Sequence, residues 1–228
     1  MIVVLKRSNL FILALSVFLS AVTVNMVDRA DIVPANAVPV SDKVIVLDAG
    51  HGASDGGAVS SSGVTEKDIN LKIALRLQKL LEQTGATVIV TRADDNAIAQ
   101  SKRSDMRLRK NIKENSAADI FVSIHMNKFS QSKYSGAQVF YSPDEKSKVL
   151  GEAIQTSMRE ILNPDNNREA KSAGDSIYIL KKSDVPSVIV ECGFLSNPEE
   201  ERLLTQSDYQ DKVAWSVYAG ITSYFDNE

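Results

Sequence analysis

The sequence predicts an α/β fold: a single domain with a twisted, mostly parallel sheet of about six strands flanked by helices on both faces. From Val38 onward, short β-branched runs alternate with longer segments whose apolar residues recur at helical spacing. A chain of 228 residues with 43% hydrophobic content can also bury one sizeable core. No internal repeat is visible, so one catalytic domain is expected.

Six short apolar runs predict the strands. They are Val44–Leu47, Thr87–Thr91, Ile120–Ile124, Gln138–Tyr141, Ile177–Leu180 and Ser187–Val190.

The helix after the first strand is the best marked. Thr65 and Asp68 predict a capping box at its start, and Gly85 ends it. Glu66 therefore falls in its first turn. Four further helices are expected, at Arg103–Asn115, Lys146–Leu162, Pro198–Leu204 and Asp208–Phe225.

The N-terminus has the features of an export signal. The basic pair Lys6-Arg7 precedes an apolar stretch, Leu10–Val24, that is shorter than the ~20 residues a membrane-spanning helix needs. It lacks the amphipathic face of a buried core helix. The small residues of Ala35-Asn36-Ala37 could form a cleavage site, although they lie far beyond the apolar stretch. Cleavage and retention as an anchor both stay open.

The sequence therefore divides into two predicted regions. Residues 1–40 are predicted to be an export signal or membrane anchor plus a linker, and residues 41–228 the catalytic domain, acting outside the cytoplasmic membrane. Membrane contact is expected only through the N-terminal segment.

The formal charge of −3, without a basic run interleaved with aromatics, argues against nucleic acid as a partner. Cys192 is the one cysteine, so any metal must take nitrogen and oxygen ligands.

Both histidines follow predicted strands: His51 after the first and His125 after the third. Glu191 directly follows the last strand. Because parallel strands present their carboxyl ends at one edge of a sheet, these three side chains are expected to share a crevice. Glu66 can join them if the loop from Gly52 to Val64 folds back. Two histidines, one glutamate and a spare glutamate match a zinc hydrolase, which holds its metal with three N/O side chains and keeps a position for water.

Each residue also has a simpler interpretation. A lone histidine beside a glycine-rich turn is commonly structural, and a glutamate in a first helical turn is favoured by the helix dipole. Cys192 is most simply a small buried hydrophobe. A cysteine hydrolase using Cys192 and a histidine base is an alternative, but no cation or helix N-terminus is evidently placed to activate the thiol.

Four separated segments resemble, in order, the zinc-dependent N-acetylmuramoyl-L-alanine amidases of bacterial cell walls. They are Leu47–Gly52, Glu66–Leu71, Val122–Asn127 and Val190–Pro198, with supporting pieces at Thr91-Arg92 and Arg107–Arg109. The resemblance extends from Val44 to the C-terminus. Met126 stands where the family often has alanine, and Cys192 where it often has threonine.

The resemblance implies that His51, Glu66 and His125 bind one Zn²⁺ and that Glu191 is the catalytic glutamate. The implied reaction is hydrolysis of the amide between N-acetylmuramic acid and L-alanine in peptidoglycan, with Glu191 taking a proton from the attacking water. Asn127 and the loop Lys128–Tyr134 are candidates for substrate contact, and a plain solvated connection is the alternative.

The residues of these motifs resemble those of the germination-specific amidases of spore-forming bacteria. Like those enzymes, the sequence shows no wall-binding repeats. The resemblance implies a role in making muramic-δ-lactam in the spore cortex together with a muramic acid deacetylase. The location would be the outer face of the cytoplasmic membrane, the cell wall or the intermembrane space of the developing spore. An accessory protein is a further expected partner. The alternatives are a vegetative cell-wall amidase and a non-catalytic wall-binding or regulatory protein.

Overall fold

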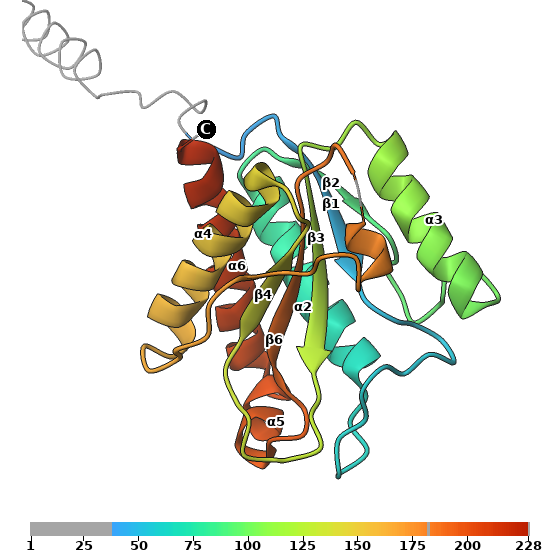
Figure 1. Ribbon diagram of the computed structural model, residues 1–228, viewed down its shortest axis with the longest axis vertical. Coiled ribbons are helices and arrows are strands. Elements are labelled where there is room, and N and C mark those ends of the chain that lie inside the picture. Colours follow the sequence, from blue (N-terminus) through green and yellow to red (C-terminus); the bar gives the residue numbers. More distant parts are fainter. Residues whose placement is uncertain (1–37, 182, 228) are drawn as a thin grey trace, which may run out of the picture. The chain divides into compact units, whose positions relative to one another are not determined.

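A six-stranded sheet lies at the centre of the computed structural model, which describes residues 38–181 and 183–227. Its strands are β1 (Val44–Ala49), β2 (Thr87–Val90), β3 (Ile120–Asn127), β4 (Gln138–Tyr141), β5 (Lys171–Ser172) and β6 (Ser187–Phe194). They lie in the order β2-β1-β3-β6-β4-β5 (Figure 1). The first four in this order are parallel to one another, whereas β4 runs antiparallel to β6 and parallel to β5. The sheet is therefore mostly parallel, as predicted.

Helices cover both faces of this sheet. They are α2 (Glu66–Gln83), α3 (Lys102–Asn115), α4 (Glu145–Leu162), α5 (Pro198–Leu204) and α6 (Ser207–Asp226). On one face, α2, α4 and α6 contribute Ile73, Ile154 and Val217 to the larger buried cluster. On the other face, α3 packs on a smaller cluster that includes Val46 and Phe121. Because both faces are covered, the central strands are almost continuously apolar.

The predicted strand Ile177–Leu180 is wrong. This segment contains a 3₁₀ turn, η2 (Tyr178–Leu180), in which Leu180 N–H donates to the carbonyl of Ile177. Its apolar side chains are buried against Phe121 on the α3 face. The run is thus apolar because it covers the sheet, and the sixth strand is the two-residue edge strand β5.

The start of α2 lies where the capping-box prediction put it, but its hydrogen bonding differs. Thr65 is the N-cap residue, yet its hydroxyl donates to the carboxylate of Asp68 and accepts no backbone N–H. Gly85, with a φ of +94°, follows the helix in a left-handed conformation that suits glycine. Glu66 is the first residue of α2, as expected.

Residues 38–227 do not include the predicted export signal, which lies outside the described part of the chain. Within the described residues, no helix combines the length and the apolar character needed to cross a membrane.

Candidate metal and catalytic site

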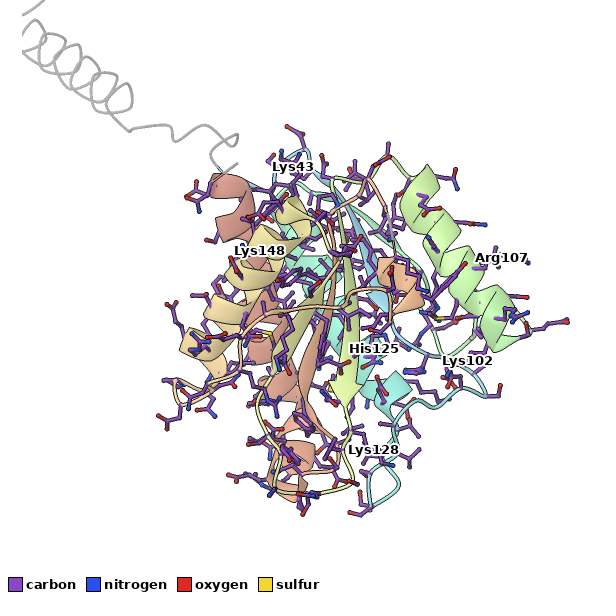
Figure 2. All side chains as sticks on the ribbon, in the orientation of Figure 1. Lys43, Lys102, Arg107, His125, Lys128 and Lys148 are labelled. Atoms are coloured by element: carbon purple, nitrogen blue, oxygen red, sulfur yellow. The ribbon has the colours of Figure 1, made fainter. Side chains whose placement is uncertain are left out.

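The sheet topology gathers the four predicted site residues at the carboxyl ends of its parallel strands. His51 lies two residues beyond the end of β1, and His125 and Glu191 are paired neighbours on β3 and β6. The loop after β1 folds back, so that Glu66 at the start of α2 reaches the same edge. Figure 2 shows His125 at the carboxyl end of β3. The four side chains therefore meet at the sheet edge where the strand ends predicted them.

Three of these side chains form a tight cluster. His51 Nε2 lies 3.2 Å from Glu66 Oε2, and His125 Nδ1 lies 2.8 Å from Glu66 Oε1. One donor atom from each residue falls within 4.8 Å of the other two. Two imidazole nitrogens and one carboxylate oxygen are a donor set that suits zinc, so the residues fit such an ion.

The Glu66 carboxylate is held from several directions. The backbone N–H of Ala58 donates to Oε2 at 2.7 Å, and that of Met126 donates to Oε1 at 3.0 Å. Burial alone would raise the pKa of Glu66, but hydrogen bonds and charge from His125 and His51 hold the pKa far below its usual range. The carboxylate is therefore ionised and fixed in orientation.

His51 is oriented by a carboxylate that the sequence analysis did not single out. Asp55 Oδ2 lies 3.0 Å from His51 Nδ1 and 3.0 Å from the Nζ of Lys102. With Nδ1 engaged by Asp55, Nε2 is left facing Glu66. This carboxylate–histidine pairing is the arrangement that commonly orients a metal-binding imidazole.

Two arginines hold the backbone that carries His51. Arg109 donates to the carbonyls of Ala49 and His51 at 2.8 and 2.7 Å, and Arg92 donates to those of Ala49 and Gly50 at 2.8 and 3.1 Å. Arg109 also forms a fully buried ion pair with Asp48 at 2.6 Å. These contacts fix His51 in its left-handed conformation, with a φ of +65°, which is uncommon for a residue other than glycine.

Two glycines let the backbone approach the cluster closely. A Cβ atom on Gly50 would lie 2.3 Å from the ring of His125. A Cβ atom on Gly57 would lie 2.4 Å from Glu66 Oε2 and 2.6 Å from His51 Cδ2. The site therefore needs glycine at both positions for steric reasons.

Glu191 lies in an environment that raises the pKa of its carboxyl group. Its Oε2 atom is buried and has no hydrogen-bond partner among the described residues. Burial raises the pKa of Glu191 to about 7; His125 opposes the rise and the charge of Glu66 adds to it. A carboxyl group with a pKa near neutrality can both accept and release a proton at physiological pH.

Cys192 does not belong to the site. Successive strand residues point to opposite faces, so Cys192 enters the larger core cluster while its neighbour Glu191 faces the histidines. Burial, together with the charges of Glu191 and Glu66, raises the pKa of the Cys192 thiol well above its usual range. This environment suppresses the thiolate that a cysteine hydrolase requires.

A hollow of about 180 Å³ opens beside the cluster, on the α3 face of the sheet. Its lining includes His51, His125, Lys102 and Met106, together with Ile179 of the 3₁₀ turn. The hollow thus lies between α3 and η2, beside the two histidines.

Asn127 lies at the end of β3, beyond this hollow. Its backbone carbonyl accepts from Leu195 N–H at 2.9 Å, while its half-buried side chain makes no hydrogen bond within the described chain. The following loop exposes aromatic surface, because Phe129 packs edge-on against Tyr134 and remains 48% exposed. The side chain of Asn127 and this loop are therefore available for contact with a substrate.

A mostly parallel α/β sheet that carries a candidate His–Glu–His metal site and a half-buried glutamate at its strand ends is an arrangement suited to a hydrolase. A sequence profile described as N-acetylmuramoyl-L-alanine amidase matches residues 45–223. The chain belongs to this family of peptidoglycan amidases.

Individual relatives agree with this assignment. The chain is 39% identical over 198 residues to the germination-specific N-acetylmuramoyl-L-alanine amidase of Bacillus subtilis, covering 83% of this chain and 82% of that protein. The structure of the CwlD amidase from Clostridioides difficile, solved in complex with the GerS lipoprotein, is 45% identical, with a TM-score of 0.78 over 82% of this chain and 100% of that one. The amidase AmiC2 of Nostoc punctiforme is 30% identical, with a TM-score of 0.73 over 81% and 97% of the two chains.

Proposed function

We propose that this amidase is zinc-dependent, with His51, Glu66 and His125 as the metal ligands and Glu191 as the general base. The observation that carries the proposal is the buried, unpartnered Oε2 of Glu191 beside a His–Glu–His cluster. Zinc in such a site supplies Lewis acidity toward a carbonyl and lowers the pKa of water.

Glu191 supplies the proton transfers of the reaction. Its carboxylate accepts a proton from the water whose oxygen attacks the carbonyl carbon of the lactyl amide. As the C–N bond breaks, Glu191 gives that proton to the departing nitrogen of L-alanine, which leaves a carboxylate on muramic acid and a free amino terminus on the peptide. Asn127, at the end of β3, is proposed to contact the substrate next to this reaction centre.

The test uses the full chain, incubated with purified peptidoglycan and assayed for new L-alanine amino termini. We expect release that stops on chelation, returns with zinc and falls by about 10²–10⁴-fold in Glu191→Gln, which is the usual contribution of acid–base catalysis. Glu199→Gln, which removes an exposed carboxylate, is the matched control and retains activity. Chelation-resistant release, or an active Glu191→Gln variant, would contradict the assignment.

We further propose that the natural substrate is spore cortex peptidoglycan, where removal of the stem peptide precedes deacetylation and formation of muramic-δ-lactam. The relatives described as germination-specific and CwlD support this role. The test incubates cortex peptidoglycan with this chain and a purified muramic acid deacetylase and measures lactam. Equal hydrolysis of cortex and vegetative peptidoglycan, with no lactam formed, would instead favour the vegetative cell-wall role; a 34% identical relative from Staphylococcus saprophyticus is described as a probable cell wall amidase.

Export and an accessory partner complete the proposal. Residues 1–40 are proposed to deliver or anchor the catalytic domain, residues 41–228, on the outer side of the cytoplasmic membrane. The GerS complex of the similar CwlD amidase supports the view that an accessory protein binds this chain as well. Fractionation of cells with and without residues 1–40 tests the first statement, and affinity isolation of the chain from sporulating cells tests the second.

A further inference from the structure

A second, larger groove lies where α3 faces the 3₁₀ turn η2. It has a volume of about 560 Å³ and is lined by Lys102, Arg103, Met106, Arg107 and Tyr178. Three of these five side chains are cationic and none is acidic. The volume falls within the range of about 300–1,000 Å³ that is usual for ligand sites.

The two arginines of this groove make no contact that stabilises the described part of the fold. Arg103 and Arg107 are exposed, and neither makes a hydrogen bond or ion pair within the described part of the chain. They stand four residues apart on α3, a spacing at which like charges destabilise a helix. Lys110 lies one helical turn further, with its Nζ 5.4 Å from the ring centroid of Tyr178, and it also pairs with Glu114 at 3.5 Å, so Arg103 and Arg107 are the unpaired cations of this surface among the described residues. The surface is therefore suited to anionic groups.

This groove continues from the candidate metal site. Lys102 and Met106 line both the groove and the 180 Å³ hollow that contains His51 and His125. Figure 2 shows Lys102 at the end of α3 nearer to His125 and Arg107 farther along the helix. A ligand that reaches the cluster through the hollow can thus extend over Met106 without leaving the surface.

We propose that this groove binds the carboxylates of the stem peptide, an inference that rests on the site assignment of the proposed function. The scissile amide joins muramic acid to the first residue of that peptide, so the rest of the peptide extends from the reaction centre. An extended chain advances about 3.4 Å per residue, so residues two to four reach beyond the cluster. Their carboxylates pair with Arg103 and Arg107, and their apolar portions lie on Met106 and Tyr178.

The test compares two soluble substrates: N-acetylmuramoyl-L-alanyl-D-glutamyl peptide with free carboxylates, and the same compound with its carboxylates converted to amides. The variants are Arg103→Gln/Arg107→Gln and, as a control with the same change in net charge, Lys79→Gln/Lys212→Gln. The control residues are exposed on α2 and α6.

We expect Arg103→Gln/Arg107→Gln to raise KM for the carboxylate compound by about tenfold, since each exposed ion pair contributes a factor of several. Its kcat should stay within about twofold, because the groove touches no reacting atom. The KM for the amidated compound should be the same as in the parent chain. The control pair should behave like the parent with both compounds.

Three results would overturn the groove assignment. They are an unchanged KM for the carboxylate compound, an equal rise with both compounds, and an equal rise in the control pair, which would mean that net charge alone attracts the substrate. Dissociation constants measured in a Glu191→Gln background separate this inference from the proposed function. A carboxylate preference that disappears with the arginines supports the groove even if Glu191→Gln remains active, and such residual activity would count against the catalytic assignment alone.

Discussion

Arg109 donates a hydrogen bond of 2.7 Å to the backbone carbonyl of His51 while its other terminal nitrogen pairs with the buried carboxylate of Asp48 at 2.6 Å. The guanidinium of Arg109 thus connects helix α3 to strand β1 and to the backbone of His51, a candidate metal ligand. The position of the His51 imidazole depends on this buried ion pair as well as on its own neighbours.

Replacing Arg109 with methionine should lower the free energy of unfolding by about 3–5 kcal/mol, the usual cost of leaving one partner of a buried pair uncompensated. Burial raises the pKa of Asp48, but Arg109 and hydroxyl donors outweigh this and lower it, so the carboxylate would lose its main partner. Urea unfolding measures the effect. Arg107→Met, on the exposed side of the same helix, should change stability by less than about 0.5 kcal/mol. A loss below about 1 kcal/mol in Arg109→Met would argue against the ion pair as a major stabilising contact.

Gly57→Ala should weaken metal binding, because the added Cβ would lie 2.4 Å from Glu66 Oε2. Gly63→Ala is a matched control: Gly63 also has a positive φ, +92° against +68°, but has no atom within 4 Å of its Cβ position. Both changes strain the backbone, and only the first places an atom against the proposed ligand Glu66. Competition with a chromophoric chelator should give at least a tenfold loss of zinc affinity for Gly57→Ala relative to Gly63→Ala. Equal affinities would mean that Glu66 adjusts freely.

Asp55→Asn tests the carboxylate that orients His51. The amide keeps the size of the side chain but removes the charge beside Nδ1, which lies 3.0 Å from Asp55 Oδ2. Loss of such an outer partner typically lowers metal affinity by about 10–100-fold. Asp95→Asn, in the neighbouring loop, alters an exposed carboxylate that pairs with Lys67 and should leave zinc affinity unchanged. Calorimetric zinc titration of the metal-free chains distinguishes the two.

Lys113 should make stability depend on alkaline pH. It is fully buried and donates to the carbonyl of Ile179, and burial lowers its pKa from 10.5 to about 8. Between about pH 8 and 10.5 the unfolded chain binds more protons at this residue than the native chain. Its contribution to the free energy of unfolding therefore rises with pH across that window, by at most about 3 kcal/mol.

Lys113→Met lacks this group, so the difference in stability between wild type and variant isolates it from tyrosines that titrate in the same range. Relative to the variant, the wild type should become more stable from pH 8 to 10.5 in urea unfolding. A constant difference across that range would mean that Lys113 keeps an ordinary pKa in the fold.

The site could be predicted from the sequence where a chemically reactive residue stands at the end of a predicted strand. His51, His125 and Glu191 each end or follow an apolar run, and the carboxyl ends of parallel strands meet, so their grouping follows from topology alone. Glu66 required the further step that the loop after β1 folds back. The metal-ligand and catalytic roles of these residues stay predictions.

Other features could not be predicted because the same local pattern allows more than one tertiary role. The apolar run before Leu180 has the composition of a strand, and only its packing on Phe121 makes it a 3₁₀ turn. Asp55 and Arg109 act through contacts with His51 that depend on how a loop and a helix are placed in space. Their only sequence signals were a polar loop and the Arg107–Arg109 segment.

The pairing of His125 with Glu191 across β3 and β6 has a consequence for how this protein tolerates change. Side chains along a strand alternate between faces, so these two groups meet only if each occupies a position that points to the same face of the sheet. Deleting a single residue within β6 ahead of Glu191 would shift the frame, turning that carboxylate into the hydrophobic interior and presenting an apolar side chain to His125. Insertions in the surrounding loops leave this alternation intact. Activity should therefore be lost more readily through changes in strand length than through changes in loop length.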